Sequence, residues 1–128
     1  MDDYVKYRLD TAKERLVAAS SLIDAGCYKD SINRSYYAIF SATRALLANE
    51  RIDFSKHSGV IGYFRRNYIK TGLLDVKYSD YIGKAFQYRT DCDYEDFFIV
   101  DRADAELQYQ HALEFYEAIE NYLNMETE

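Results

Sequence analysis

The chain has 128 residues, a length that fits one domain built around one hydrophobic core. It contains no proline and only 5 glycines, and 48% of its residues are hydrophobic, so the composition favours long helices over a turn-rich β fold. The net charge of −6 argues against a broad electropositive surface that follows a nucleic-acid backbone, although a few local cations suffice to hold one or two phosphates.

No secretion or membrane signal is visible. The first residues lack a basic stretch followed by an apolar segment, and nowhere do about 18 apolar residues run together. We therefore expect a cytoplasmic protein that does not enter a membrane.

Cys27 and Cys92 fit no metal-ligand spacing, and a reducing compartment disfavours a disulfide between them. We interpret both cysteines as small buried residues.

Two helices are predicted in the first part of the chain. The first carries apolar residues at alternating steps of four and three and ends near Gly26. Its apolar stripe consists of Val5, Leu9, Ala12, Leu16, Ala19 and Ile23. A second helix begins near Lys29 or Asp30 and presents a wide aromatic face. That face consists of Ile32, Tyr36, Ile39, Thr43 and Leu46, with Tyr37, Phe40 and Leu47 beside it.

Three further helices follow. Ser55 is the expected N-cap of a third helix, which Thr71 and Gly72 close. A fourth helix runs from about Leu74 past Arg89 and fades among acidic residues. After an irregular segment, residues 97–100, Asp101 caps the last helix. The apolar positions of this helix are Ala105, Tyr109, Ala112, Tyr116, Ile119 and Leu123.

These elements predict an all-α protein, an antiparallel bundle of four to five helices with short connections. We expect residues 1–124 to form a single domain and residues 125–128 to form a loose C-terminal tail.

Three polar patches interrupt the amphipathic pattern of these helices. Their sequences are NRSYYAIF at residues 33–40, KH at residues 56–57 and RTDCDY at residues 89–94. A bundle core can be built from Leu, Ile and Ala, so paired tyrosines, a His at a helix start and an Arg/Asp/Tyr cluster need another explanation. We therefore look for function in these patches.

In this order and spacing, the three patches resemble the HEPN superfamily, in particular its small single-domain, UPF0332-like branch. The resemblance covers nearly the whole chain and implies a helical bundle. It also implies the toxin-like subunit of a two-component toxin–antitoxin system. Such proteins are often paired with a minimal nucleotidyltransferase (MNT), which neutralises them by binding or by nucleotidylating a tyrosine. By position, Tyr94 is the acceptor that the resemblance suggests.

Active HEPN ribonucleases work without a metal and carry an Arg followed, after a gap of four to six residues, by a His that faces the dimer mate. Here the corresponding positions after Arg89 hold Tyr94, Glu95 and Asp96, and none is His. A tyrosine is a poor base at neutral pH and an acidic side chain repels phosphate. The resemblance thus leaves open whether the chain is a metal-independent endoribonuclease.

Arg89 is the first candidate catalytic residue, because a guanidinium offers planar, permanently charged donors to a scissile phosphate. The structural alternative is an ion pair with Asp93 one helical turn away. We expect Arg89 to have little packing to lose. His57 would supply the missing imidazole from the start of the third helix, or would simply cap that helix. The ribonuclease hypothesis requires Arg89, with His57 or Tyr94, to form a composite site across a homodimer.

Nucleotide or partner contacts are predicted at Asn33, Tyr36, Tyr37, Lys56 and Asp93. The tyrosines are suited to stacking on a base, and the alternative is aromatic core packing.

His111 is interpreted as structural. The acidic residues near position 93 lack the spacing of a calcium loop, so we expect neither a metal nor another cofactor.

Two functions remain open at this point. One is a toxin-like ribonuclease that acts on RNA, and the other is a catalytically inactive nucleotide-binding or protein-interaction module with the same fold. A plain dimeric scaffold is a third possibility.

Overall fold

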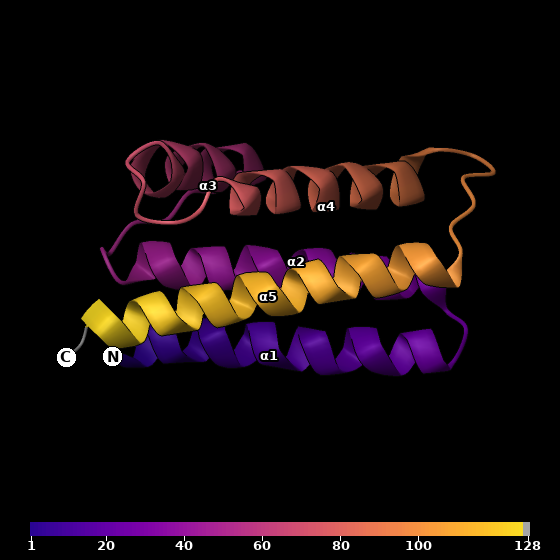
Figure 1. Cartoon of the computed structure of the whole chain (residues 1–128), viewed down its shortest axis with the longest axis horizontal. Helices are drawn as coiled ribbons and strands as arrows, with labels where there is room; N and C mark the ends of the chain where they lie inside the picture. The colour runs from indigo at the N-terminus through magenta and orange to yellow at the C-terminus, as the bar shows by residue number, and fades with distance from the viewer. Residues whose placement is uncertain (127–128) are drawn as a thin grey trace.

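The computed structural model describes residues 1–126, which fold into five α-helices and one π-helical segment (Figure 1). The elements are α1 (Asp3–Asp24), α2 (Tyr28–Ala48), α3 (His57–Phe64), η1 (Arg65–Ile69), α4 (Lys77–Tyr94) and α5 (Arg102–Glu126). Helices α1, α2, α4 and α5 alternate in direction along the chain, while the short α3 and η1 sit at one end of the bundle (Figure 1). The predicted all-α antiparallel bundle is confirmed.

Helix α2 is the centre of the bundle and packs against α1, α4 and α5. All five residues of its predicted core face are buried, as are Phe40 and Leu47, and Tyr37 is half-buried at the edge of this face. The predicted stripes of α1 and α5 are buried too, with the half-buried Tyr109 as the exception. Burial of these apolar faces is the main force that holds the helices together.

The ends of α1 and α5 follow from local capping chemistry. Gly26 follows the end of α1 with a φ of +79°, a left-handed conformation that glycine adopts without steric cost. The predicted N-cap of α5 is confirmed, because the Asp101 carboxylate accepts a hydrogen bond from the Asp104 amide at 2.9 Å. In return, the Asp104 carboxylate accepts one from the Asp101 amide at 3.0 Å. Helix α5 continues to Glu126, two residues into the predicted tail, and residues 127–128 lie outside the described part.

Helix α2 begins at Tyr28, one residue before the predicted start near Lys29. Two other boundary predictions are wrong. Helix α3 begins at His57 and has Lys56 at its N-cap position, so Ser55 is not the cap. The turn before α3 is instead organised by Asp53, whose carboxylate accepts a hydrogen bond from the Phe54 amide. Helix α4 begins at Lys77 rather than near Leu74, because the Leu74 amide bonds back to the Tyr68 carbonyl and stays in the loop.

The interpretation of both cysteines as buried is wrong for Cys27, which is exposed in the turn between α1 and α2. Cys92 is half-buried, and burial raises the pKa of its thiol. Among residues 1–126, no helix is long and apolar enough to cross a membrane.

Candidate functional site

The three polar patches meet beside the middle of α2. Tyr36 and Tyr37 come from α2, His57 from the first position of α3, and Arg89 from α4. The Tyr36 hydroxyl lies 2.7 Å from Nδ1 of His57. An Nη2 N–H of Arg89 donates to the Tyr37 hydroxyl at 3.2 Å. Each of the adjacent tyrosines therefore contacts one of the three candidate catalytic side chains, Tyr36 contacting His57 and Tyr37 contacting Arg89.

An aromatic cluster positions the His57 ring. The ring centroid lies 4.1 Å from that of Phe40, 5.8 Å from that of Tyr36 and 6.0 Å from that of Tyr37. Tyr36 is fully buried, and its ring also packs against that of Phe86 of α4, with the ring centroids 5.9 Å apart. A rigid aromatic frame of this kind fixes the imidazole in one orientation.

Arg89 lies across the same tyrosines. Its guanidinium carbon is 5.8 Å from the Tyr36 ring centroid and 5.7 Å from that of Tyr37, within the range of cation–π attraction. The predicted pair with Asp93 is confirmed, with Nε 3.1 Å from Oδ2. This contact lacks hydrogen-bond alignment, so the buried Nε–H has no aligned acceptor. Only 20% of the Arg89 side chain is exposed, so the expectation that it has little packing to lose is wrong.

The electrostatics keep the site uncharged at its centre. Burial lowers the pKa of His57 below its ordinary value, and the positive charges of Arg89 and Arg44 lower it further. Burial raises the pKa of Tyr36 well above its usual range, so its hydroxyl stays protonated. At neutral pH, a neutral imidazole therefore shares a hydrogen bond with a neutral phenol, and Arg89 supplies positive charge next to them.

The remaining predicted residues lie at different distances from this centre. Asp93 joins it through Arg89, and the exposed Lys56 directly precedes His57 at the N-cap position of α3. Asn33 is half-buried one turn before Tyr37 on α2. Tyr94 is 74% exposed at the end of α4, and among the described contacts none joins its side chain to Arg89 or His57. Within one protomer the structure does not bring Tyr94 into the cluster.

His111 takes no part in this cluster. Its ring stacks on Tyr81 with centroids 4.0 Å apart and an interplanar angle of 8°, and burial lowers the pKa of the imidazole. Among residues 1–126, no group of three or more His, Cys, Asp or Glu side chains is placed to hold a metal ion.

Two further residues shape the site: Phe40, which the sequence placed only within the first patch and beside the buried face of the second helix, and Arg44, to which it gave no role. Phe40 forms one face of the His57 environment, and Arg44 contributes to the low pKa of His57. Both lie on the face of α2 that carries Tyr36, at steps of four residues, so helical spacing is the signal that would have found them. His57, Phe40 and Arg44 also line a surface hollow of about 440 Å³, together with Asp53, Phe54 and Ser55.

The fold and the site thus define a small helical-bundle protein with a tyrosine-supported Arg/His cluster. The family model described as HEPN domain matches residues 5–122. The chain therefore belongs to the HEPN domain family.

Similar proteins come from archaea and bacteria. A Methanocaldococcus jannaschii protein named "Putative toxin MJ0142" is 35% identical over 98 residues, which cover 77% of this chain and 67% of that protein. A Thermotoga maritima protein named "UPF0332 protein" is 30% identical over 119 residues, which cover 93% of this chain and 90% of that protein. A second M. jannaschii protein, "Putative toxin MJ0605", is 35% identical over 86 residues, covering 67% of this chain and 64% of that one.

Proposed function

We propose that this chain is the toxin-like subunit of a two-component system and cleaves RNA without a metal, using Arg89 and His57. The observation that carries this proposal is that the two side chains, 32 positions apart in sequence, are held on adjacent tyrosine hydroxyls. The names of the M. jannaschii relatives support the toxin-like role. His57 takes the place of the imidazole that is missing after Arg89.

The chemistry follows from the protonation states. In the tautomer whose Nδ1–H donates to the Tyr36 oxygen, Nε2 of His57 is the basic atom. Nε2 accepts the proton of a ribose 2′-hydroxyl, whose oxygen attacks the adjacent phosphorus. The bond from phosphorus to the 5′-oxygen breaks, and the leaving oxygen takes up a proton from solvent, to which the His57 imidazolium releases the proton that it accepted. The products are a 2′,3′-cyclic phosphate and a 5′-hydroxyl. Arg89 stabilises the negative charge that grows on the phosphate oxygens.

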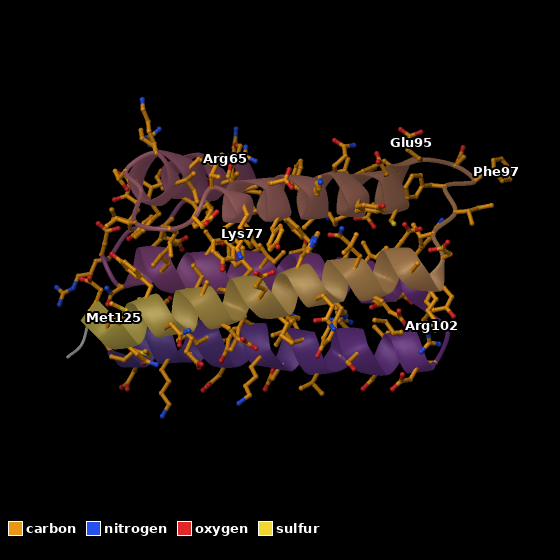
Figure 2. The ribbon with its side chains drawn as sticks, in the orientation of Figure 1. Arg65, Lys77, Glu95, Phe97, Arg102 and Met125 are labelled. Atoms are coloured by element: carbon orange, nitrogen blue, oxygen red, sulfur yellow. The ribbon has the colours of Figure 1, made fainter. Side chains whose placement is uncertain are left out.

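The proposed partners are a second copy of the chain and an MNT nucleotidyltransferase. Tyr94 is open to an enzyme that would modify it, because its side chain is 74% exposed. Beside it, the loop between α4 and α5 holds Phe97 and Ile99 almost fully exposed, at 96% and 86%. Figure 2 shows Phe97 pointing away from the bundle at the tip of this loop. Exposed apolar side chains of this kind are typical of interaction surfaces.

The test is RNA cleavage by the purified protein in the presence of EDTA. We expect cleavage by the wild type and its loss in Arg89→Ala and His57→Gln. Lys84→Ala is the matched control, because Lys84 is also a cation of α4 in an i,i+4 ion pair but lies outside the cluster. Cleavage that survives Arg89→Ala, or that stops when EDTA is added, would refute the proposal.

A second candidate is a catalytically inactive nucleotide-binding or protein-interaction module with the HEPN fold. The observation that favours it is that the residues after the Arg89 helical turn are Tyr94, Glu95 and Asp96, without a His. This candidate predicts binding of a nucleotide or partner that depends on Arg89, with no RNA cleavage by any variant. Induction of the protein in cells, followed by total RNA analysis, separates the two candidates.

A further inference from the structure

We propose that the 440 Å³ hollow beside His57 is a nucleotide subsite, which takes a nucleoside next to the phosphate held by Arg89 and His57. The hollow lies between α2 and the loop that leads into α3. Phe54 would stack on the base, and Arg44 would attract a neighbouring phosphate. The placement of the scissile phosphate rests on the function proposed above, whereas the binding of a nucleotide in the hollow does not require cleavage.

The hollow is directly connected to the candidate site. His57 belongs to both, because its Nδ1 contacts the Tyr36 hydroxyl while its ring lines the hollow. Phe40 likewise lines the hollow and packs against the His57 ring. A ligand in the hollow therefore lies against the imidazole that acts as the proposed base.

Two arginines meet at one carboxylate in the wall of the hollow, although the protein as a whole is acidic. The Asp53 carboxylate accepts hydrogen bonds from Arg44, at 2.7 Å from Nη2 and 3.3 Å from Nε. Arg8 of α1 contacts the same carboxylate at 3.4 Å. The hydrogen bonds from Arg44 hold the pKa of Asp53 below its usual value, so two guanidiniums share one negative charge. Because Arg8, which does not line the hollow, shares the Asp53 carboxylate, Asp53 neutralises Arg44 only in part, and part of the Arg44 charge remains for an anion.

Phe54 forms a preorganised platform on one wall. Its side chain remains 39% exposed, so one part of it faces solvent. It packs so closely over Gly59 that a Cβ at that position would lie 2.9 Å from the Phe54 side chain. Its ring also contacts Tyr63, with centroids 5.8 Å apart. An ordered, partly exposed aromatic side chain next to a cation is the arrangement on which single-stranded nucleotides stack.

The structural alternative is that Asp53 only ties α1 and α2 to the loop. One arginine would be enough for this role, and it does not need an exposed phenylalanine beside it. The ionic contacts alone are partly solvated and would add little to stability. Nucleotide binding distinguishes the two explanations.

The experiment measures binding of a fluorescein-labelled, fully 2′-O-methylated RNA tetranucleotide by fluorescence anisotropy. This probe cannot be cleaved through a 2′-hydroxyl, so the measurement is independent of catalysis. We expect Phe54→Ala to weaken binding by about 5- to 150-fold, since loss of one base–aromatic stack costs about 1–3 kcal/mol. Phe54→Trp should restore it. Leu73→Ala, at an exposed apolar residue that does not line the hollow, is the control and should bind like the wild type.

Arg44→Gln should weaken binding and reduce its dependence on salt, because one cation near the phosphate is lost. The His57 ring resonances in the NMR spectrum should shift when the probe is added to the wild type, and much less in Phe54→Ala. Circular dichroism verifies that each variant is folded.

Wild-type affinity in Phe54→Ala, or no binding by the wild type at millimolar protein, would overturn the subsite. If Phe54→Ala binds normally while Arg89→Ala abolishes cleavage of ordinary RNA, the result supports the proposed function and refutes the nucleotide subsite. If the probe binds through Phe54 but ordinary RNA is never cleaved, the result supports the nucleotide subsite and refutes the proposed ribonuclease activity.

Discussion

The hydroxyl oxygen of Tyr36 and Nδ1 of His57 lie 2.7 Å apart, although 21 positions separate the two residues in the chain. The hydrogen bond joins the fully buried centre of α2 to the first residue of α3. It therefore fixes how the second patch is placed against the first. The orientation of the candidate base depends on a residue that itself belongs to the core.

Tyr36→Phe should keep the fold and lower the free energy of unfolding by about 1–2 kcal/mol, because it leaves Nδ1 of a partly buried His57 without a partner. Urea unfolding measures the loss. Tyr37→Phe is the matched control: its hydroxyl serves Arg89, which keeps its other contacts, so a smaller loss is expected. Equal stability of Tyr36→Phe and the wild type would show that the bond does not hold His57.

Arg89→Ala should lower the free energy of unfolding by about 1–2 kcal/mol, in addition to abolishing activity. The variant loses the hydrogen bond to Tyr37 and the attraction to two aromatic rings. Arg89→Lys keeps the charge but not the planar donors, so activity should remain low while part of the stability returns. Lys84→Ala should change stability by less than about 0.5 kcal/mol, because its ion pair is exposed.

Asp93→Asn should lower the free energy of unfolding by less than about 1 kcal/mol, because the Asp93 side chain is 38% exposed and its ion pair is partly solvated. Thermal and urea unfolding both report this change. A loss of several kcal/mol would mean that the pair is effectively buried and that the cluster around Arg89 serves the fold.

The stability of the protein should increase as the pH rises from about 5 to 7. Burial lowers the pKa of both His57 and His111 below 6.5, so the unfolded chain binds more protons than the folded one in this range. The contribution of the two neutral histidines to the free energy of unfolding is complete above the unfolded-state pKa of 6.5. It is lost as the pH falls towards their lower pKa values in the folded state. Unfolding of the double variant His57→Gln, His111→Gln, measured at several pH values, should show a smaller slope between pH 5 and 7. An unchanged slope would refute the assignment.

Two glycine substitutions should act in opposite directions. Gly26→Ala should destabilise the protein by about 1–2 kcal/mol, because alanine must adopt the left-handed φ of +79°. Gly62→Ala should stabilise it by about 0.5–1 kcal/mol, because Gly62 lies inside α3 and a Cβ there meets no atom within 4 Å. Denaturant unfolding of both variants and of the wild type measures whether each substitution raises or lowers the free energy of unfolding.

The sequence by itself determined the helices and their buried faces. The four-three stripes of α1 and α5 and the aromatic face of α2 are periodic over many turns, and burial of such a face dominates over local detail. Gly26 and Asp101 could be recognised as helix ends because their effects reach only a few residues. The pair between Arg89 and Asp93 was equally accessible, since it needs only the geometry of one helical turn.

Only the tertiary structure decided which of the three patches touch and how. The contacts of Tyr36 with His57 and of Tyr37 with Arg89 span 21 and 52 positions, and they depend on how α3 and α4 cross α2. Helix periodicity sets which face is buried but leaves this lateral placement to side-chain packing. For the same reason, the hollow beside His57 and its charged wall at Arg44 and Asp53 became visible only when the loop before α3 was placed against α2.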